Sequence, residues 1–238
     1  MGLVGRMCGR RQRRLLVVLA ALLAALVGVV VVTGAAWSND RLERRCERLA
    51  AARLQRAADV TGSGDRVLVM GDSWSAGRGL ERPADSWPAQ LDGRVHVDGF
   101  SGSGFSVDAS PCVGRAYADR VDQALQRAGA RPDLVVLQGG LNETDQPVAA
   151  IRSGVRRVLA RLEARGVPAR DIVIVGPVAA PRRAAGVPRV DGVLADEAAR
   201  AGVLYLSMVH VQVPYLRDRL HPTAEGHEEF GQAVAALL

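Results

Sequence analysis

The sequence contains no lysine and few aromatic residues. All 31 of its basic residues are arginine, which we attribute to a biased composition rather than to a function. Phenylalanine, tryptophan and tyrosine make up 4% of the 238 residues, so the sequence offers no evident platform for stacking sugars. Apolar residues make up 48%. That fraction and the length suit one α/β domain with a packed core and a short appendage.

Several motifs of metal and nucleotide chemistry are also absent. The sequence has no HExxH, no paired-cysteine metal cluster, no phosphate-binding P-loop and no Gly-x-Gly-x-x-Gly fingerprint. The Gly-x-Ser-x-Gly turn of the α/β-hydrolases is missing too, because Ser75 occupies its second glycine. We therefore expect no metal and no nucleotide cofactor.

The positive charge is unevenly distributed. The formal net charge is +6 and the isoelectric point is near 10.2, which would suit a nucleic-acid partner. Residues 1–36, however, carry no acidic residue and five arginines, so only about +1 is left for residues 37–238. Nucleic-acid binding needs a basic stripe and usually a recognisable motif. We expect no nucleic-acid partner. The five arginines are Arg6, Arg10, Arg11, Arg13 and Arg14.

An apolar segment follows these arginines. Residues 15–32 contain no charged or polar side chain, and residues 33–36 extend the run. About 20 apolar residues can span a bilayer, and flanking arginines keep their side in the cytoplasm. The length favours an uncleaved single-pass anchor over a signal peptide cut after the small residues Gly34 and Ala36. Both interpretations place the rest of the chain outside the cell, either at the membrane or secreted.

The sequence has three cysteines. Cys8 belongs to the cytoplasmic segment and should stay reduced. Cys46 and Cys112 are the only two cysteines on the exported side, where a disulfide is permitted. The sequence leaves open whether they are bonded.

Beyond the apolar segment, strand-like and helical patterns alternate. Residues 40–58 have apolar positions at helical spacing and predict an amphipathic helix, either a stalk or a helix packed on the domain. Residues 61–65 resemble a linker. Apolar runs predict strands at 67–70, 95–97, 134–137, 172–175 and 203–206, and helices at 115–128, 147–165, 190–201 and 223–237. This alternation indicates a parallel sheet flanked by helices. Residues 177–188 read as a loop.

Polar segments with the residues of nucleophilic catalysis follow several of these runs. Gly71-Asp72-Ser73-Trp74 places a hydroxyl at the end of the first strand, where parallel sheets expose their chemistry. A serine needs a base and an oxyanion site to act as a nucleophile. The later segments are Ser101-Gly102-Ser103, Gly140-Leu141-Asn142-Glu143 and Asp218-Arg219-Leu220-His221-Pro222.

Together the four segments resemble the sequence blocks of the SGNH (GDSL-type) hydrolases, a family of serine esterases and lipases. The resemblance covers residues 66–238 and implies a three-layer α/β/α, flavodoxin-like fold with about five parallel strands. It implies Ser73 as nucleophile, His221 as base and Asp218 as the residue that orients the base. The oxyanion donors would be the N–H groups of Ser73 and Gly102 and the side-chain amide of Asn142.

The other histidines fit the role of base less well. His96 lies in a predicted strand without a suitably spaced carboxylate, His210 reads as structural, and His227 as a surface or packing residue of the last helix. Two positions depart from the family pattern. Glu143 stands where the third block usually has aspartate, and Asp98 where an asparagine often precedes the second-block glycine. Neither is a catalytic position.

The resemblance predicts a hydrolase domain at 66–238, after a basic segment (1–14), an anchor or signal (15–36), and a helix with linker (37–65). An exported serine hydrolase acting on an ester-bearing small molecule, glycan or lipid is the expected function. An acyltransferase would use the same site, and a non-catalytic binding module would keep only the fold. The sequence does not indicate an oligomeric state.

Overall fold

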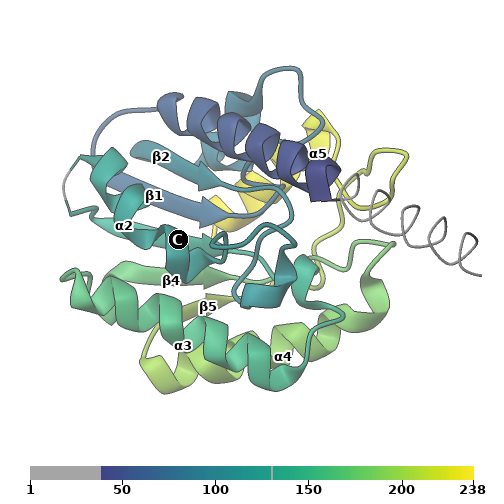
Figure 1. Ribbon diagram of the computed structural model, residues 1–238. Coiled ribbons are helices and arrows are strands. Elements are labelled where there is room, and N and C mark those ends of the chain that lie inside the picture. Colours follow the sequence, from purple (N-terminus) through teal and green to yellow (C-terminus); the bar gives the residue numbers. More distant parts are fainter. Residues whose placement is uncertain (1–38, 130) are drawn as a thin grey trace, which may run out of the picture. The chain divides into compact units, whose positions relative to one another are not determined.

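The computed structural model describes residues 39–129 and 131–238. Five strands in this part of the chain form one parallel sheet in the order β2-β1-β3-β4-β5 (Figure 1). The predicted parallel sheet of five strands is thus confirmed. Its strands are β1 (Arg66–Gly71), β2 (Arg94–Gly99), β3 (Leu134–Gln138), β4 (Ile172–Val175) and β5 (Leu204–Leu206).

The helices connect these strands. They are α2 (Tyr117–Ala128), α3 (Val148–Ala164), α4 (Val187–Ala201), α5 (Ala224–Ala235) and a helix over residues 39–58. Short 3-10 helices lie between them: η1 (Pro83–Asp85), η2 (Trp87–Gln90), η3 (Val107–Ala109), η4 (Leu141–Glu143), η5 (Ala169–Asp171) and η6 (Ala184–Gly186).

Two helix starts show how local chemistry sets the boundaries. Thr223 caps α5, because its hydroxyl accepts a hydrogen bond from the Gly226 N–H at 3.1 Å. Helix α4 begins at Val187, so the prediction of a loop through residue 188 was wrong. Pro188 lies in the first turn of α4, where its missing N–H costs no helical hydrogen bond.

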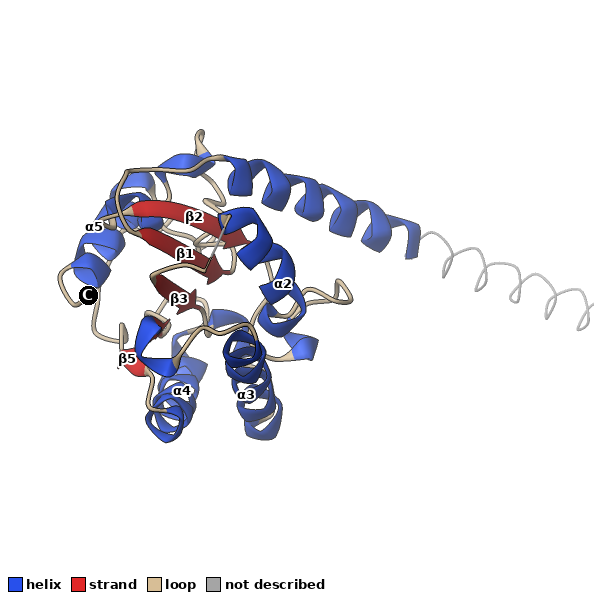
Figure 2. Ribbon diagram, turned by 90° about the vertical axis from the view of Figure 1, so that its left-hand side faces the viewer, coloured by secondary structure: helices blue, strands red, loops and turns tan. Residues whose placement is uncertain are grey.

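Helices cover both faces of the sheet (Figure 2). In β1, Leu68 and Met70 belong to the apolar cluster that includes residues of α2, α3 and α4. Val67 and Val69 belong to the cluster on the other face, with Phe230 of α5. Because both faces are buried, the central strands β1, β3 and β4 are largely continuous apolar runs. The edge strand β2 instead alternates valine with His96 and Asp98.

Residues 47–238 form one compact unit. Two arginines of the helix over residues 39–58 are buried in it. Arg53 and Arg56 expose 3% and 1% of their surface. Within the described residues no helix is both long enough and apolar enough to cross a membrane. The predicted anchor or signal at 15–36 lies outside them.

Cys46 and Cys112 are each disulfide-bonded. They stand 66 positions apart in the sequence. In the chain-entropy model, a cross-link that closes a loop of this length stabilises the fold by about 4 kcal/mol, less any native strain.

We predict that these two cysteines pair with each other and stabilise residues 39–238. Reduction should lower the melting temperature, and Cys46→Ser should reproduce that loss while leaving activity intact at low temperature. Cys112→Ser and the double variant are the matched controls, and both should have the same melting temperature as Cys46→Ser. Two free thiols titrated in the unfolded, non-reduced domain would contradict this pairing.

Candidate active site

Ser73 lies in a tight turn directly after β1. The turn is held by backbone hydrogen bonds from Ala76 N–H to the Asp72 carbonyl and from Arg78 N–H to the Ser73 carbonyl, both at 3.0 Å. The Asp72 side chain accepts from the Trp74 N–H at 2.9 Å. Because Asp72 fills the capping role in this turn, the Ser73 hydroxyl is left for another partner.

That partner is His221. The Ser73 Oγ lies 3.0 Å from His221 Nε2, and His221 Nδ1 lies 2.5 Å from an Asp218 carboxylate oxygen. With its Nδ1–H donating to Asp218, the imidazole presents Nε2 as an acceptor for the hydroxyl. Ser73 and His221 each expose 7% of their surface.

The loop between Asp218 and His221 is shaped by the same carboxylate. Its second oxygen accepts the backbone N–H groups of Leu220 and His221, both at 3.0 Å. Arg219 takes a left-handed backbone conformation with φ of 58°, so the chain turns back within three residues. Partial desolvation favours the protonated form of Asp218 and by itself would raise its pKa. The hydrogen bonds from His221 and Leu220 outweigh this effect and hold the pKa of Asp218 well below its usual range.

Trp74 fastens this loop to the Ser73 turn. Its ring is buried and its Nε1–H donates to the Leu220 carbonyl at 3.1 Å. The ring packs edge-on against Phe230 of α5, with centroids 5.1 Å apart. Nothing in the sequence pattern predicted this contact, because 146 positions separate Trp74 from Leu220.

Gly102 and Asn142 lie in the loops that follow β2 and β3. Gly102 has φ of 80°, a left-handed conformation that favours glycine. Its turn is tied to β1, because the Phe100 N–H donates to the Gly71 carbonyl at 3.0 Å. Asn142 Nδ2 donates to the Ser103 carbonyl at 2.9 Å and lies 3.4 Å from an Asp72 carboxylate oxygen.

Two buried carboxyl groups accompany these loops. Desolvation raises the pKa of Asp72 to about 6, although hydrogen bonds from Trp74 and Gln138 oppose the rise. Desolvation, followed by the charge of Asp72, raises the pKa of Glu143 to about 8. Glu143 fits only because residue 104 is glycine. A Cβ there would lie 1.8 Å from its Oε1.

No hydrogen bond joins the Ser73 hydroxyl to the other three histidines, all of which lie in the described residues. His227 is fully buried in α5, where its Nδ1 accepts from the Trp87 N–H at 3.4 Å. Burial lowers the pKa of His227 to about 4. His96 is buried in β2. His210 is exposed after β5, so the interpretation of His210 as a structural residue is not supported.

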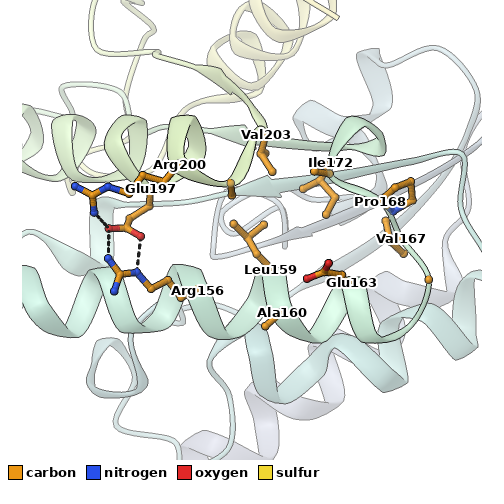
Figure 3. A pocket seen from close by; sticks show the side chains of 13 residues that line it. Arg156, Leu159, Ala160, Glu163, Val167, Pro168, Ile172, Glu197, Arg200 and Val203 are labelled. Carbon is orange, nitrogen blue, oxygen red and sulfur yellow. Dashed lines mark hydrogen bonds and ion pairs between the residues drawn. The ribbon is translucent and has the colours of Figure 1, made fainter.

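A cavity of about 630 Å³ lies between α3 and α4 (Figure 3). Its lining includes Ile172, the first residue of β4. The cavity therefore lies at the amino ends of the strands, whereas Ser73 follows the carboxyl end of β1. Its buried acid, Glu197, is paired with Arg156 at 2.7 Å and Arg200 at 2.8 Å. This cavity therefore has no part in the Ser73 arrangement.

Comparisons with known proteins agree with this fold. One solved structure is Est24, a carbohydrate acetylesterase from Sinorhizobium meliloti. It has 17% identity and a TM-score of 0.58 over 74% of this chain and 97% of that chain. The aryl esterase of M. smegmatis has 19% identity and a TM-score of 0.56 over 73% and 98%. A protein from Agrobacterium tumefaciens str. C58 has 25% identity and a TM-score of 0.58 over 74% and 97%.

A comparison with curated proteins found no match. The family model of the GDSL-like lipases and acylhydrolases matches residues 69–229. The match spans well over half of the chain and takes in all four segments singled out in the sequence. The chain therefore belongs to the GDSL-like lipase/acylhydrolase family of ester-hydrolysing enzymes, as its resemblance to the SGNH hydrolases predicted.

Proposed function

We propose that this enzyme cleaves carboxylic esters through an acyl-enzyme formed on Ser73. The observation that carries the proposal is the continuous line of hydrogen bonds from Asp218 through His221 to the Ser73 hydroxyl, at 2.5 and 3.0 Å. A buried hydroxyl in contact with an imidazole that a carboxylate orients is the arrangement that activates serine.

The reaction proceeds in two stages. His221 Nε2 takes the proton of Ser73 as its oxygen attacks the ester carbonyl, and Asp218 stabilises the imidazolium that forms. His221 then gives the proton to the leaving alcohol, which departs and leaves the acyl group on Ser73. In the second stage a water molecule, deprotonated by the same imidazole, releases the acid and restores the serine.

The tetrahedral intermediate of each stage carries an oxyanion. We propose that the N–H groups of Ser73 and Gly102 and the amide of Asn142 stabilise it. One amide proton of Asn142 is engaged by the Ser103 carbonyl at 2.9 Å. The other is turned toward Asp72 at the longer distance of 3.4 Å, so this weaker contact can be exchanged for the oxyanion.

An acyltransferase is the alternative for the same site. The acyl-enzyme would then pass its acyl group to a sugar or lipid hydroxyl instead of water. A non-catalytic binding module is disfavoured, because a degenerate site has no reason to keep the serine, histidine and aspartate in contact. We propose an ester-bearing small molecule, glycan or lipid as substrate.

We further propose that the catalytic domain faces the outside of the cell. The support is the sequence alone: residues 15–36 are an apolar run preceded by five arginines. Protease accessibility of intact cells expressing the full chain tests this topology. Protection of residues 47–238 would contradict it.

Replacing the nucleophile should abolish turnover. Ser73→Ala should lower the turnover of p-nitrophenyl esters by several powers of ten, because loss of a triad member removes the covalent route. Ser207→Ala, an exposed serine after β5, is the matched control and should keep full activity. Near-normal turnover by a folded Ser73→Ala protein would exclude the mechanism.

Removing one oxyanion donor should affect catalysis and not stability. Asn142→Ala should lower kcat by roughly 10²–10³-fold with little change in melting temperature. Gln146→Ala, from the same loop, is the control and should keep kcat. A large fall in melting temperature with kcat preserved would mean that Asn142 only holds its loop.

Glu143 should make stability depend on pH. The pKa of Glu143 is 4.5 in the unfolded chain and about 8 in the fold, so the side chain is neutral in both states at low pH. Between these two pKa values Glu143 ionises only in the unfolded chain. The free energy of unfolding therefore falls as the pH rises. The glutamine of Glu143→Gln cannot ionise. In urea denaturation, the variant should therefore gain stability relative to wild type from pH 5 to pH 8; a constant difference would show that Glu143 is ionised in the fold.

A further inference from the structure

Three charged side chains with almost no exposed surface lie next to the Ser73 turn. They are Arg53, Asp98 and Arg120, which expose 3%, 1% and 1% of their surface. Arg53 comes from the helix over residues 39–58, Asp98 from β2 and Arg120 from α2. Buried charges are costly unless they are paired and hydrogen-bonded, so the three must satisfy one another.

Asp98 lies between the two arginines. Its carboxylate accepts the Arg53 Nε–H at 3.0 and 2.8 Å, shared between its two oxygens. It also accepts from Arg120 Nη1, which in addition donates to the Asp98 backbone carbonyl at 2.8 Å. Arg127 approaches the same carboxylate at 3.7 Å, but its side chain is 34% exposed.

Arg120 extends from Asp98 to the two loops of the proposed oxyanion site. Its Nη2 donates to the Gly71 carbonyl at 3.1 Å and to the Ser103 hydroxyl at 3.2 Å. Gly71 leads directly into the Ser73 turn. The Ser103 carbonyl is the acceptor that holds the amide of Asn142. One guanidinium thus binds the backbone next to the nucleophile and the residue that holds the side-chain donor.

We propose that Arg120 is a positioning residue for the oxyanion donors, and that Arg53 and Asp98 hold it in place. The helix over residues 39–58, which precedes the residues matched by the family model, thereby supports catalysis through Arg53. The inference rests on the proposed function, in which Ser73, Gly102 and Asn142 stabilise the oxyanion.

The test compares two arginine variants beside one carboxylate. Arg53→Gln should lower kcat roughly tenfold and leave KM within about twofold, because small displacements of catalytic groups cost rate rather than substrate binding. Arg127→Gln removes an exposed arginine near Asp98 and is the matched control; its kcat should stay within about twofold of wild type. Ser103→Ala deletes the hydroxyl that Arg120 binds, which also donates to the Phe100 carbonyl at 2.8 Å. It should lower kcat by about the same factor as Arg53→Gln, and it tests the proposal if Arg53→Gln does not fold.

A second readout separates positioning from a merely structural role. A phenylboronic acid binds serine hydrolases as a tetrahedral adduct, so its inhibition constant reports on the oxyanion donors. In Arg53→Gln and Ser103→Ala the inhibition constant should rise by the same factor as kcat falls. Folded variants with normal kcat and normal boronate inhibition, even at a reduced melting temperature, would overturn the positioning role. A wild-type protein that neither cleaves esters nor binds the boronate would overturn the proposed function as well.

Discussion

The parallel alignment of β2, β1 and β3 is the constraint on which the site depends. In this order the strand that leads to Ser73 lies between the strands that lead to Gly102 and Asn142. Gly71 is in register with Gly99, so the two loops leave the sheet side by side. Neighbouring strands are only about 4.8 Å apart. Side chains and backbone groups at the start of these loops therefore meet without any long excursion of the chain.

His221 reaches the same place by a different route. It belongs to the last loop before α5, beyond the edge strand β5. The loop is closed by an antiparallel bridge between Tyr215 and Pro222 and by the Asp218 carboxylate, which accepts backbone N–H groups within it. The Trp74 ring then fixes the loop to the Ser73 turn. The hydrogen bonds of this loop, rather than a strand of the sheet, therefore hold His221 in place.

The sequence predicted those features that depend on local pattern. Strands β1, β3, β4 and β5 are apolar runs, whereas β2 carries only Val95 and Val97 as apolar side chains. The capping hydroxyl of Thr223 precedes a helical pattern. The four polar segments could be recognised because each is contiguous. Contacts between distant positions left no such signal. Asp98 was visible only as a departure from the family pattern. Its partners lie 45 positions before it and 22 after it, and neither spacing marks a pair.

The buried acids near Ser73 could not be predicted for a related reason. Whether Glu143 is neutral depends on its desolvation and on the neighbouring charge of Asp72, both of which are properties of the folded chain. The side chain extends into space that Gly104 leaves free. In the sequence, Gly104 and Glu143 are two unrelated features, a turn glycine and an unusual third-block residue. In the structure each explains the other.

The absence of lysine also takes on a physical meaning at Arg120. A guanidinium has five N–H donors in a planar fork, whereas an ammonium has three on a single atom. Arg120 uses its donors on five acceptors: the carbonyls of Arg115, Asp98 and Gly71, the Asp98 carboxylate and the Ser103 hydroxyl. A lysine could satisfy at most three of them, and its single nitrogen could not lie close to all of these segments at once. The preference for arginine is a property of the whole composition, yet at this position the fold requires it.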